Sequence, residues 1–406
     1  MFTTYKVVSG DTFEIVSRKV YGYESKSNLI AQANPDVSEP LSAGVELIIP
    51  KQTTVLPRIN PTDQNQVSIS IDDQIVSIWE SVQINLSMDS IDTVNFIAPF
   101  ERDLPGFKDI FRPFEFKDLS VVVGDELLFN GTQVAVTPTI QTQRKSIDVS
   151  GYSRPGVLND CTAPISAYPL EFNGQDLKVI ADKITEPFNI SNTFLSTIGA
   201  TFERVACEPG KKLLPFLVEL ARQRALVLTN DVDGNLVFWQ SITTGLPVAR
   251  LSQGESPLLS ITPNFSPQDY YSHITGVDFI IVGYTGSTYT VKNDKLKTLR
   301  PFTFKTPDTI GASVKSAVQA KSGRMFANMV SYSITLSTWR DPLGNLWKPN
   351  TTLTLIAPDA MIYNEYEFII RNVELIRESD NETAVLEIVL PGSLEAKLPE
   401  VLPWDE

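Results

Sequence analysis

The sequence predicts a multi-domain, strand-rich α+β protein, and three observations lead to this fold class. The chain has 406 residues, whereas a single hydrophobic core stops growing at about 250–300 residues. Short alternations of apolar and polar residues recur over residues 67–150, with a spacing typical of a compact barrel or sandwich, and the end of the chain returns to strands. Residues 151–245 combine two segments of helical periodicity with a hairpin pattern. We therefore expect strand-rich segments on either side of an α/β central region.

The N-terminal residues predict a small unit with the order strand, helix, helix, strand. The strands are expected at residues 5–8 and 46–49, and the second helix at about residues 25–33. Asp11 and Glu14 have the spacing of a capping box at the start of the first helix. Apolar residues recur on one face of each helix, and a glycine ends the first one: Phe13, Val16, Val20, Gly22, Leu29, Ile30 and Ala33.

Turn residues and helical spacing organise the rest of the chain. Asp72-Asp73-Gln74 and Asp233-Gly234 predict hairpin turns, since Asp and Gly favour tight turns between strands. Helices are expected at residues 177–184 and 215–221, and a longer one at about residues 312–329. The strands that end the chain are expected to pair back onto the first strand-rich segment.

Charge and rare residues exclude several classes of function. Asp and Glu outnumber Lys and Arg by 48 to 34, so the net charge is −14, the opposite of what a sequence-specific nucleic-acid binder needs. Two cysteines, Cys161 and Cys207, cannot form a disulfide framework. The single histidine, His273, excludes His-rich zinc sites and most Ser-His-Asp triads. We expect no membrane partner, because no apolar run approaches the roughly 18 residues of a spanning helix.

No set of residues predicts catalysis, a metal or a cofactor, and we expect none. Residues 231–235 hint at a calcium loop, but the positions of Gly and Glu in an EF-hand loop are not matched, so a hairpin turn is the better interpretation. No pair of carboxylates stands out for glycoside hydrolysis, and Cys161 is far from His273 in sequence. Four tryptophans are interpreted as core residues, with an aromatic glycan platform as the weaker alternative: Trp79, Trp239, Trp339 and Trp347.

The N-terminal unit resembles a LysM domain. The matching residues are spread over its strands, turns and helices: Tyr5, Val7, Gly10-Asp11-Thr12, Ile15, Asn34, Leu41, Gly44, Leu47 and Ile49-Pro50. LysM domains are small glycan-binding modules, often directed at peptidoglycan, and they also occur as docking modules in tail-like machines. The resemblance implies one of these two roles, and we expect docking.

The chain beyond the N-terminal unit resembles the Mu-type baseplate hub family of contractile-tailed phages. The resemblance spans about residues 67–395 and rests on four motifs that occur in the order expected for the family. They are residues 78–96 with Met88-Asp89-Ser90-Ile91, residues 149–164 with Gly151-Tyr152-Ser153, residues 208–237 with Leu220-Ala221-Arg222, and residues 339–350 with Trp339, Arg340 and Trp347.

This resemblance implies an architectural role without catalysis. Hub proteins of this family form a homotrimeric ring in which each subunit holds two tube-like β-barrel domains, so that three chains adapt the sixfold tail tube to a threefold spike. The ring lines the DNA conduit, where an acidic surface repels phosphates. The implied partners, within a virion tail baseplate assembled in the host cytoplasm, are the central spike protein, tail tube or distal tube-initiator proteins, baseplate wedge or sheath-initiator proteins, and the tape measure protein.

The two resemblances together divide the chain. We expect a LysM domain at residues 1–52, a linker at 53–66, a first tube-like β domain at 67–150, a central α/β domain at 151–245, a second tube-like β domain with a long helix at 246–395, and a C-terminal tail at 396–406. The alternative function is a tail protein that binds or lyses peptidoglycan through its LysM domain. A hub of a non-viral contractile injection system would differ only in its genomic setting.

Overall fold

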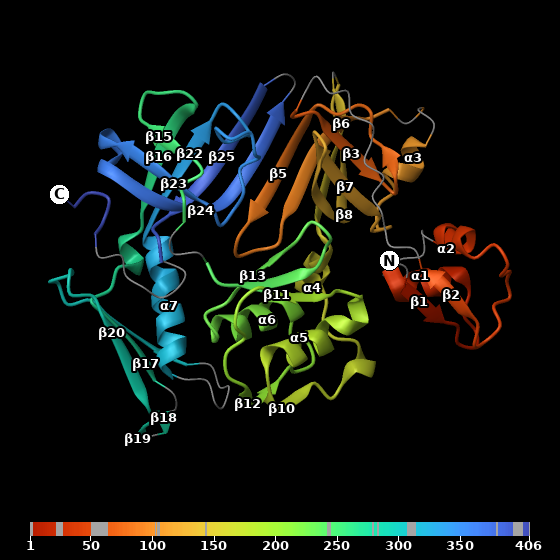
Figure 1. Ribbon diagram of the computed structural model, residues 1–406, viewed down its shortest axis with the longest axis horizontal. Coiled ribbons are helices and arrows are strands. Elements are labelled where there is room, and N and C mark those ends of the chain that lie inside the picture. The colour runs from red at the N-terminus through yellow and green to blue at the C-terminus, as the bar shows by residue number, and fades with distance from the viewer. Residues whose placement is uncertain are drawn as a thin grey trace.

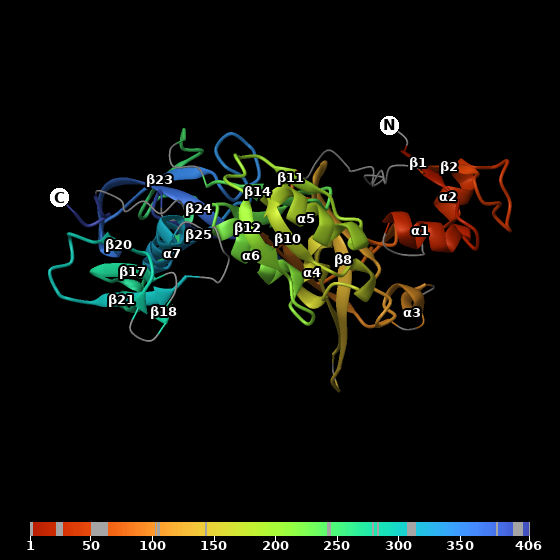
Figure 2. The ribbon, with the colours of Figure 1, turned by 90° about the horizontal axis from the view of Figure 1, so that it is seen from below.

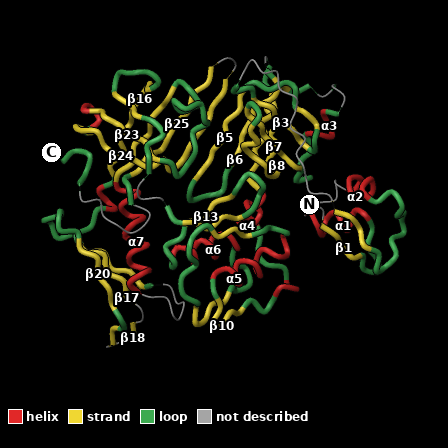
Figure 3. The backbone as a smooth tube through the Cα atoms, in the orientation of Figure 1, coloured by secondary structure: helices red, strands yellow, loops and turns green. Residues whose placement is uncertain are grey.

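The computed structural model has an extended arrangement, with the N-terminal unit at one end and the C-terminus at the other (Figure 1). It describes residues 3–21, 27–49, 64–101, 103, 106–142, 144–241, 245–277, 280–281, 284–306, 314–378, 381–392 and 401–405. Strands dominate the upper part of the molecule, and helices gather below them (Figure 3). No helix among these residues is long and apolar enough to cross a membrane.

The N-terminal unit has the predicted order of strand, helix, helix and strand. It consists of β1 (Thr3–Lys6), α1 (Phe13–Tyr21), α2 (Ser27–Ala33) and β2 (Glu46–Ile49), with β1 and β2 antiparallel. The Asn34 amide joins the second helix to the sheet: its nitrogen donates to the carbonyl oxygens of Ile30 and Ile48, and its oxygen accepts from the Ile48 N–H, each at 2.8 Å. The core is small and apolar: Val7, Phe13, Val16, Ile30, Leu41, Leu47 and Ile49.

The predicted capping box at Asp11 is wrong, because Thr12 caps the first helix. The Thr12 hydroxyl oxygen accepts from the Ile15 N–H at 3.2 Å. Gly10 adopts a φ of 94° and turns Asp11 back towards β1. There its carboxylate accepts from the Val8 N–H at 2.9 Å and pairs with Lys19 at 2.6 Å. Ala33 is half-buried, and the predicted roles of Val20, Gly22 and Leu29 fall outside the residues and side chains that the structure describes.

Thirteen strands form one large sheet with the order β16-β22-β25-β24-β5-β6-β9-β8-β7-β3-β4, to which β23 and β15 are added beside β24. The first strand-rich segment contributes β3 (Val67–Ile71), β4 (Gln74–Ile75), β5 (Ser81–Ser87), β6 (Thr93–Pro99), β7 (Asp118–Val123), β8 (Glu126–Ile140) and β9 (Lys145–Ser153). The second contributes β15 (Arg250–Ser252), β16 (Leu258–Phe265), β22 (Val330–Leu336), β23 (Thr352–Ala357), β24 (Ile362–Glu378) and β25 (Asn381–Val389). The distal end of the β8–β9 hairpin projects from the body (Figure 2).

The long strand β24 joins the two strand-rich segments. One of its edges pairs with β25, and the other pairs first with β23 and then with β5, from Asn372 opposite Ser87 to Glu378 opposite Ser81. The prediction that the end of the chain pairs back onto the first segment is thus confirmed. The expected barrels are not confirmed, because the order of the described strands is open and no closed barrel is found among them. One apolar core extends under both segments.

The central unit lies below the sheet and has a core of its own. Its helices are α4 (Val157–Asp160), α5 (Leu177–Thr185) and α6 (Leu213–Arg222). Its strands are β10 (Glu171–Gln175) paired with β12 (Phe202–Ala206), and β11 (Asn192–Phe194), β14 (Leu236–Trp239) and β13 (Val227–Asn230) in a second sheet. The apolar faces predicted for α5 and α6 are buried, and Asp176 caps α5 by accepting from the Val179 N–H at 2.9 Å.

The two predicted hairpin turns are confirmed. Residues 72 and 73 connect β3 to β4, and residues 231–235 connect β13 to β14. One Asp231 carboxylate oxygen accepts from the backbone N–H groups of Asp233 and Asn235, at 3.1 Å and 2.8 Å. This carboxylate therefore stabilises the hairpin turn.

The short helix α3 (Phe107–Ile110) lies beside β4. The type and the C-terminal end of the helix α7 (Val314–Met329) match the prediction. This helix packs on β17 (His273–Val277) and β20 (Thr288–Lys292), which form a sheet with β21 (Pro301–Lys305), and β18 (Ile280–Ile281) and β19 (Tyr284–Thr285) make a separate short pair. The helix packs so closely on β17 that a Cβ at Gly276 would lie 2.4 Å from a methyl group of Val318. Only glycine fits this contact.

Two of the four tryptophans that were interpreted as core residues anchor the turn between β22 and β23. Trp339 and Trp347 are buried, and their indole N–H groups donate to the carbonyl oxygens of Thr383 and Thr338, at 2.9 Å and 3.0 Å. Trp79 and Trp239 are half-buried against apolar clusters. The interpretation of Trp339 and Trp347 as core residues is confirmed.

Replacement of Trp347 by Ala should lower the free energy of unfolding by about 3–5 kcal/mol, because it leaves a cavity in the core. Chemical denaturation of the variant and the wild type measures the change. Leu343→Ala, in the same turn but 78% exposed, is the control and should change the stability little. Equal stabilities for the Trp347→Ala variant and the wild type would contradict this prediction.

Candidate functional site

The loop between β5 and β6, residues 88–92, lies where the large sheet, the central unit and α7 meet. The Thr229 hydroxyl of β13 donates to the carbonyl oxygen of Ser87 at 2.7 Å. The Trp239 indole N–H of β14 donates to the carbonyl oxygen of Met88 at 3.0 Å. Because β5 is itself paired with β24, these bonds attach the central unit to the strands that join the two segments.

Asp92 is a buried carboxylate at this junction. It accepts from the Ser87 N–H and from the side-chain amide of Asn230, both at 2.9 Å, and its own N–H donates to the Asn230 oxygen at 2.8 Å. Burial raises the pKa of Asp92 to about 7, because removal from water disfavours the charged form more than these hydrogen bonds favour it. The junction therefore contains a carboxylic acid that titrates near neutral pH.

Asp89, from the same loop, binds Arg371 of β24 through both carboxylate oxygens. The contacts are 2.9 Å from the arginine Nη2 and 3.3 Å from its Nε, and Glu387 lies 3.5 Å from Nη1. Burial alone would lower the pKa of Arg371, but Asp89 and Glu387 raise it above its usual value. The charged pair fixes the loop to β24, because both partners are mostly buried and the geometry is bidentate.

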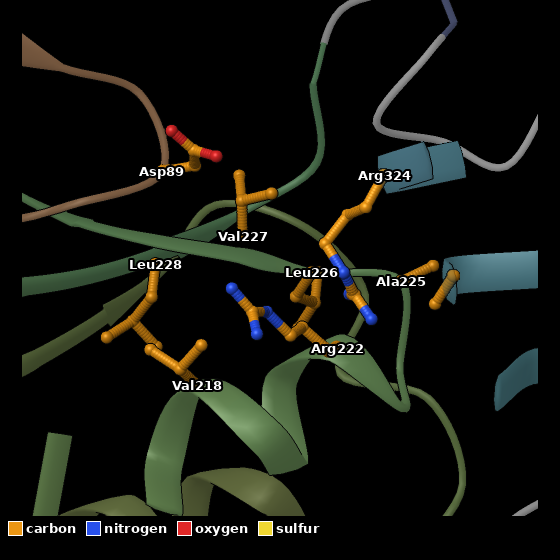
Figure 4. A pocket seen from close by; sticks show the side chains of 9 residues that line it. Asp89, Val218, Arg222, Ala225, Leu226, Val227, Leu228 and Arg324 are labelled. Carbon is orange, nitrogen blue, oxygen red and sulfur yellow. The ribbon is translucent and has the colours of Figure 1, made fainter. Parts of the chain in front are cut away.

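Beside this pair lies a small pocket of about 20 Å³ that contains two further arginines. Arg222 extends into it from α6 and Arg324 from α7, while Asp89 lies on the far side (Figure 4). Burial, and then the positive charge of Arg222, lower the pKa of Arg324 to about 10. Both groups remain positively charged at neutral pH, so this pocket is a positive site in an acidic chain.

A larger groove of about 760 Å³ begins at Asp89 and Arg222 and continues across β5, β24, β25, β22 and β16. Polar and charged side chains make up much of its lining: Asn85, Ser87, Asn264, Ser331, Ser333, Asn372, Glu374 and Glu387. Among the residues that the structure describes, no three His, Cys, Asp or Glu side chains gather as metal ligands would. The groove offers hydrogen bonds and charges to a polar partner.

Some residues of the four sequence motifs lie together in the structure, and others lie apart. Asp89 and Arg222, from two of the four motifs, line the same pocket. Arg340, from the fourth motif, instead donates to the Gln64 carbonyl oxygen and the Asn65 side chain, both at 2.7 Å, beside the first strand-rich segment.

Three charged residues of the site were missed in the sequence: Asp92, Arg324 and Arg371. Asp92 ends the β5–β6 loop, Arg324 lies on α7 and Arg371 lies on β24, so no local spacing relates the three residues to one another. The cysteine and the histidine considered as a nucleophile and its base do not come together either. Cys161 ends α4 in the central unit, whereas His273 begins β17, where its Nδ1 lies 3.0 Å from the Ser272 hydroxyl.

The central unit is similar to a domain of known proteins. Residues 155–240 match the family model "Baseplate hub protein gp44-like, second domain". The chain is 22% identical over 329 residues to baseplate hub protein gp44 of Escherichia phage Mu, with 77% of this chain and 84% of the relative covered.

Two solved structures are similar in fold. The 43 kDa tail protein of prophage MuSo2 from Shewanella oneidensis gives a TM-score of 0.69 at 22% identity, and the match covers 81% of this chain and 99% of that one. The tail protein from Neisseria meningitidis MC58 gives a TM-score of 0.68 at 18% identity, with 81% and 98% covered. The chain thus shares the fold of these tail proteins, and the matches support the resemblance to a Mu-type baseplate hub.

The titration of Asp92 predicts how the stability depends on pH. Its pKa is higher in the folded state, about 7, than the ordinary value of 3.8, so folding takes up a proton between about pH 4 and 7. The contribution of Asp92 to the free energy of unfolding is therefore fully present below pH 4 and is lost as the pH rises through 7. The loss amounts to at most about 4 kcal/mol.

Asp92→Asn keeps the shape of the side chain and removes this titration. The melting temperature of the wild type should fall between pH 5 and pH 8 relative to that of the variant. Asp233→Asn, in an exposed turn, should follow the wild type. Parallel pH profiles for the wild type and Asp92→Asn would show that Asp92 does not titrate in this range.

Proposed function

We propose that this chain is the structural hub of a contractile phage tail baseplate. The observation that carries the proposal is the likeness to the phage Mu baseplate hub protein over 84% of that protein. The match of residues 155–240 to the second domain of the same kind of protein supports it. In this role the chain holds other proteins in place and catalyses no reaction.

The proposed assembly is a homotrimeric ring. In each chain, residues 67–150 and 246–395 act as two tube-like units, so three chains present six such units to a sixfold tail tube and three equivalent faces to a central spike. The pairing of β5 with β24 supports this arrangement, because it holds the two strand-rich segments in one fixed orientation. Residues 151–245 form the central unit between them.

The proposed partners follow from the position of a hub in the tail. They are the spike protein below the ring, tail tube or distal tube-initiator proteins above it, wedge or sheath-initiator proteins around it, and the tape measure protein. The ring would line the conduit for DNA. The net charge of −14 supports this role, because an acidic wall repels the phosphates of a passing duplex.

The test of the hub proposal is the mass of the assembled protein in solution. Alone or with the spike protein, the chain should sediment at about three times the 45.0 kDa of one subunit. Bound spike should add its own mass to the trimer. A chain that stays monomeric at tens of micromolar, even with spike and tube proteins present, would contradict the proposal.

We infer that the N-terminal unit, residues 1–52, is a LysM domain that docks onto a neighbouring baseplate protein. Its strand-helix-helix-strand order supports the LysM assignment. The turn at Gly10-Asp11-Thr12 could line a sugar groove, which keeps peptidoglycan binding as the alternative function. However, Asp11 already accepts from Tyr5 and Val8 and pairs with Lys19, so the turn has a sufficient structural role.

The full chain should therefore neither bind nor lyse peptidoglycan. After centrifugation with insoluble peptidoglycan, it should remain in the supernatant to the same extent as a variant that lacks residues 1–63. The turbidity of the suspension should not fall. Retention of the full chain that soluble chitin-type oligosaccharides compete away would instead support the glycan-binding alternative, and clearing of the suspension would support a lytic one.

A further inference from the structure

Two phenylalanines project from the segment that follows α3. The Phe114 side chain is 88% exposed and the Phe116 side chain 52% exposed. Both residues adopt a left-handed backbone, with φ of 65° and 50°, which is unfavourable for a bulky residue. Strained residues of this kind persist only where the surroundings hold them, and they gather at functional sites. We call these two side chains the aromatic knob.

A network of charges holds the knob in this strained conformation. Arg112 pairs with Asp109 at 2.7 Å and with Glu115 at 2.9 Å, and Lys117 pairs with Glu115 at 3.1 Å and also donates to the Asp109 carbonyl oxygen. Each exposed ion pair contributes little to stability alone, but together these pairs connect the start, the middle and the end of the segment that carries the knob. The knob is thus preorganised, which reduces the entropy lost on binding.

The surface beside the knob is also apolar. Ile75 and Ile78 are each about half exposed, at 56% and 51%. With Phe107 and Phe111 they line a hollow of about 120 Å³ next to α3. Several exposed apolar groups at one end of the molecule indicate an interaction surface, whereas single scattered ones do not.

A second apolar hollow lies at the C-terminal end of the molecule. It measures about 430 Å³ and is lined by Phe265, Pro267, Tyr270, Met329, Met361 and Trp404. Its volume is within the range, about 300–1,000 Å³, of pockets that enclose drug-sized groups. Phe265 and Trp404 stand edge to face, with ring centroids 5.4 Å apart, and methionine side chains adapt readily to an inserted ring.

The knob and the hollow lie at opposite ends of the main body. In Figure 1, α3 is at the right, and the C-terminus, two residues beyond Trp404, is at the left. Two complementary surfaces at different places on one chain make a heterologous contact, which generates a ring when the rotation between copies closes. An apolar knob and an apolar hollow on the same chain therefore fit a second copy of this chain.

We propose that Phe114 and Phe116 of one copy insert into the C-terminal hollow of the next copy and form the contact that closes the ring. This inference rests on the proposed hub function and names the residues of its subunit interface. Aromatic side chains in desolvated pockets are typical interface hot spots. The contact is heterologous, so each subunit uses its knob on one side and its hollow on the other.

Three variants test the proposal by sedimentation velocity. The knob variant is Phe114→Ala with Phe116→Ala, the hollow variant is Met361→Glu, and the control is Ile165→Ala, which removes an 86% exposed side chain elsewhere. Subunit association should weaken at least about tenfold in the knob and hollow variants, since a hot spot contributes this much or more, and it should be unchanged in the control. The mutated side chains are all at least half exposed, and thermal melts confirm that the variants fold.

Mixing the two defective variants is the decisive measurement. The intact hollow of the knob variant can still accept the intact knob of the hollow variant, so an equimolar mixture should form dimers that cannot close into trimers. Neither variant alone should form these dimers. Wild-type association by both variants would overturn the contact but leave the hub proposal standing. If the knob and hollow variants still form trimers but no longer bind a tail protein, the knob–hollow contact would be overturned in favour of a contact with that protein. If the wild type never assembles, both the contact and the hub proposal would be overturned.

Discussion

The pairing of β24 with β5 is the contact on which the rest of the structure depends. It joins residues that are nearly 300 positions apart, from Asn372 opposite Ser87 to Glu378 opposite Ser81. Register matters here, because a shift of one residue would turn every buried side chain of β24 towards solvent. The pairing makes one continuous sheet and one apolar core from two segments that the sequence presents as separate.

The junction around the β5–β6 loop follows from this pairing. Once Ser87 lies opposite Asn372, Asp89 is within reach of Arg371, and Asp92 faces Asn230 of the central unit. Thr229 and Trp239 then bind the loop backbone. A displacement of the central unit would therefore also displace β5 and β24, the strands that join the two halves of the sheet. This coupling suits a part that must hold several partners in a fixed geometry.

Local features of the fold could be predicted from the sequence, whereas those that depend on distant residues could not. The helical faces of α5 and α6 and the turn at Asp233-Gly234 are encoded by spacing within a few residues, and all three are confirmed. The cap at Asp11 was assigned wrongly because Thr12 is an equally good cap, and only the fold brings Lys19 to Asp11. The open sheet was missed for the same reason, since alternation shows that strands exist but not which strands pair.

The candidate site was predictable only in part, because electrostatics depends on burial. The aspartates and arginines of the junction look like ordinary surface charges in the sequence. The pKa of Asp92 is raised and that of Arg324 is lowered chiefly because the folded chain excludes water from these two groups. The motifs did single out Asp89 and Arg222, but no spacing indicated that they would line one pocket.

The net negative charge of the chain would also affect how copies of it associate. Repulsion between subunits of charge −14 opposes random association, but at physiological salt it is screened beyond about 8 Å. A contact that is apolar at its centre is little affected by this repulsion, because its stability comes from the area removed from water. The same charge would keep exposed groups such as Phe114 and Phe116 from promiscuous aggregation before assembly. In the proposed ring, charge and apolar contact would thus have separate roles: charge would oppose random association, and the knob and hollow would select the right surface.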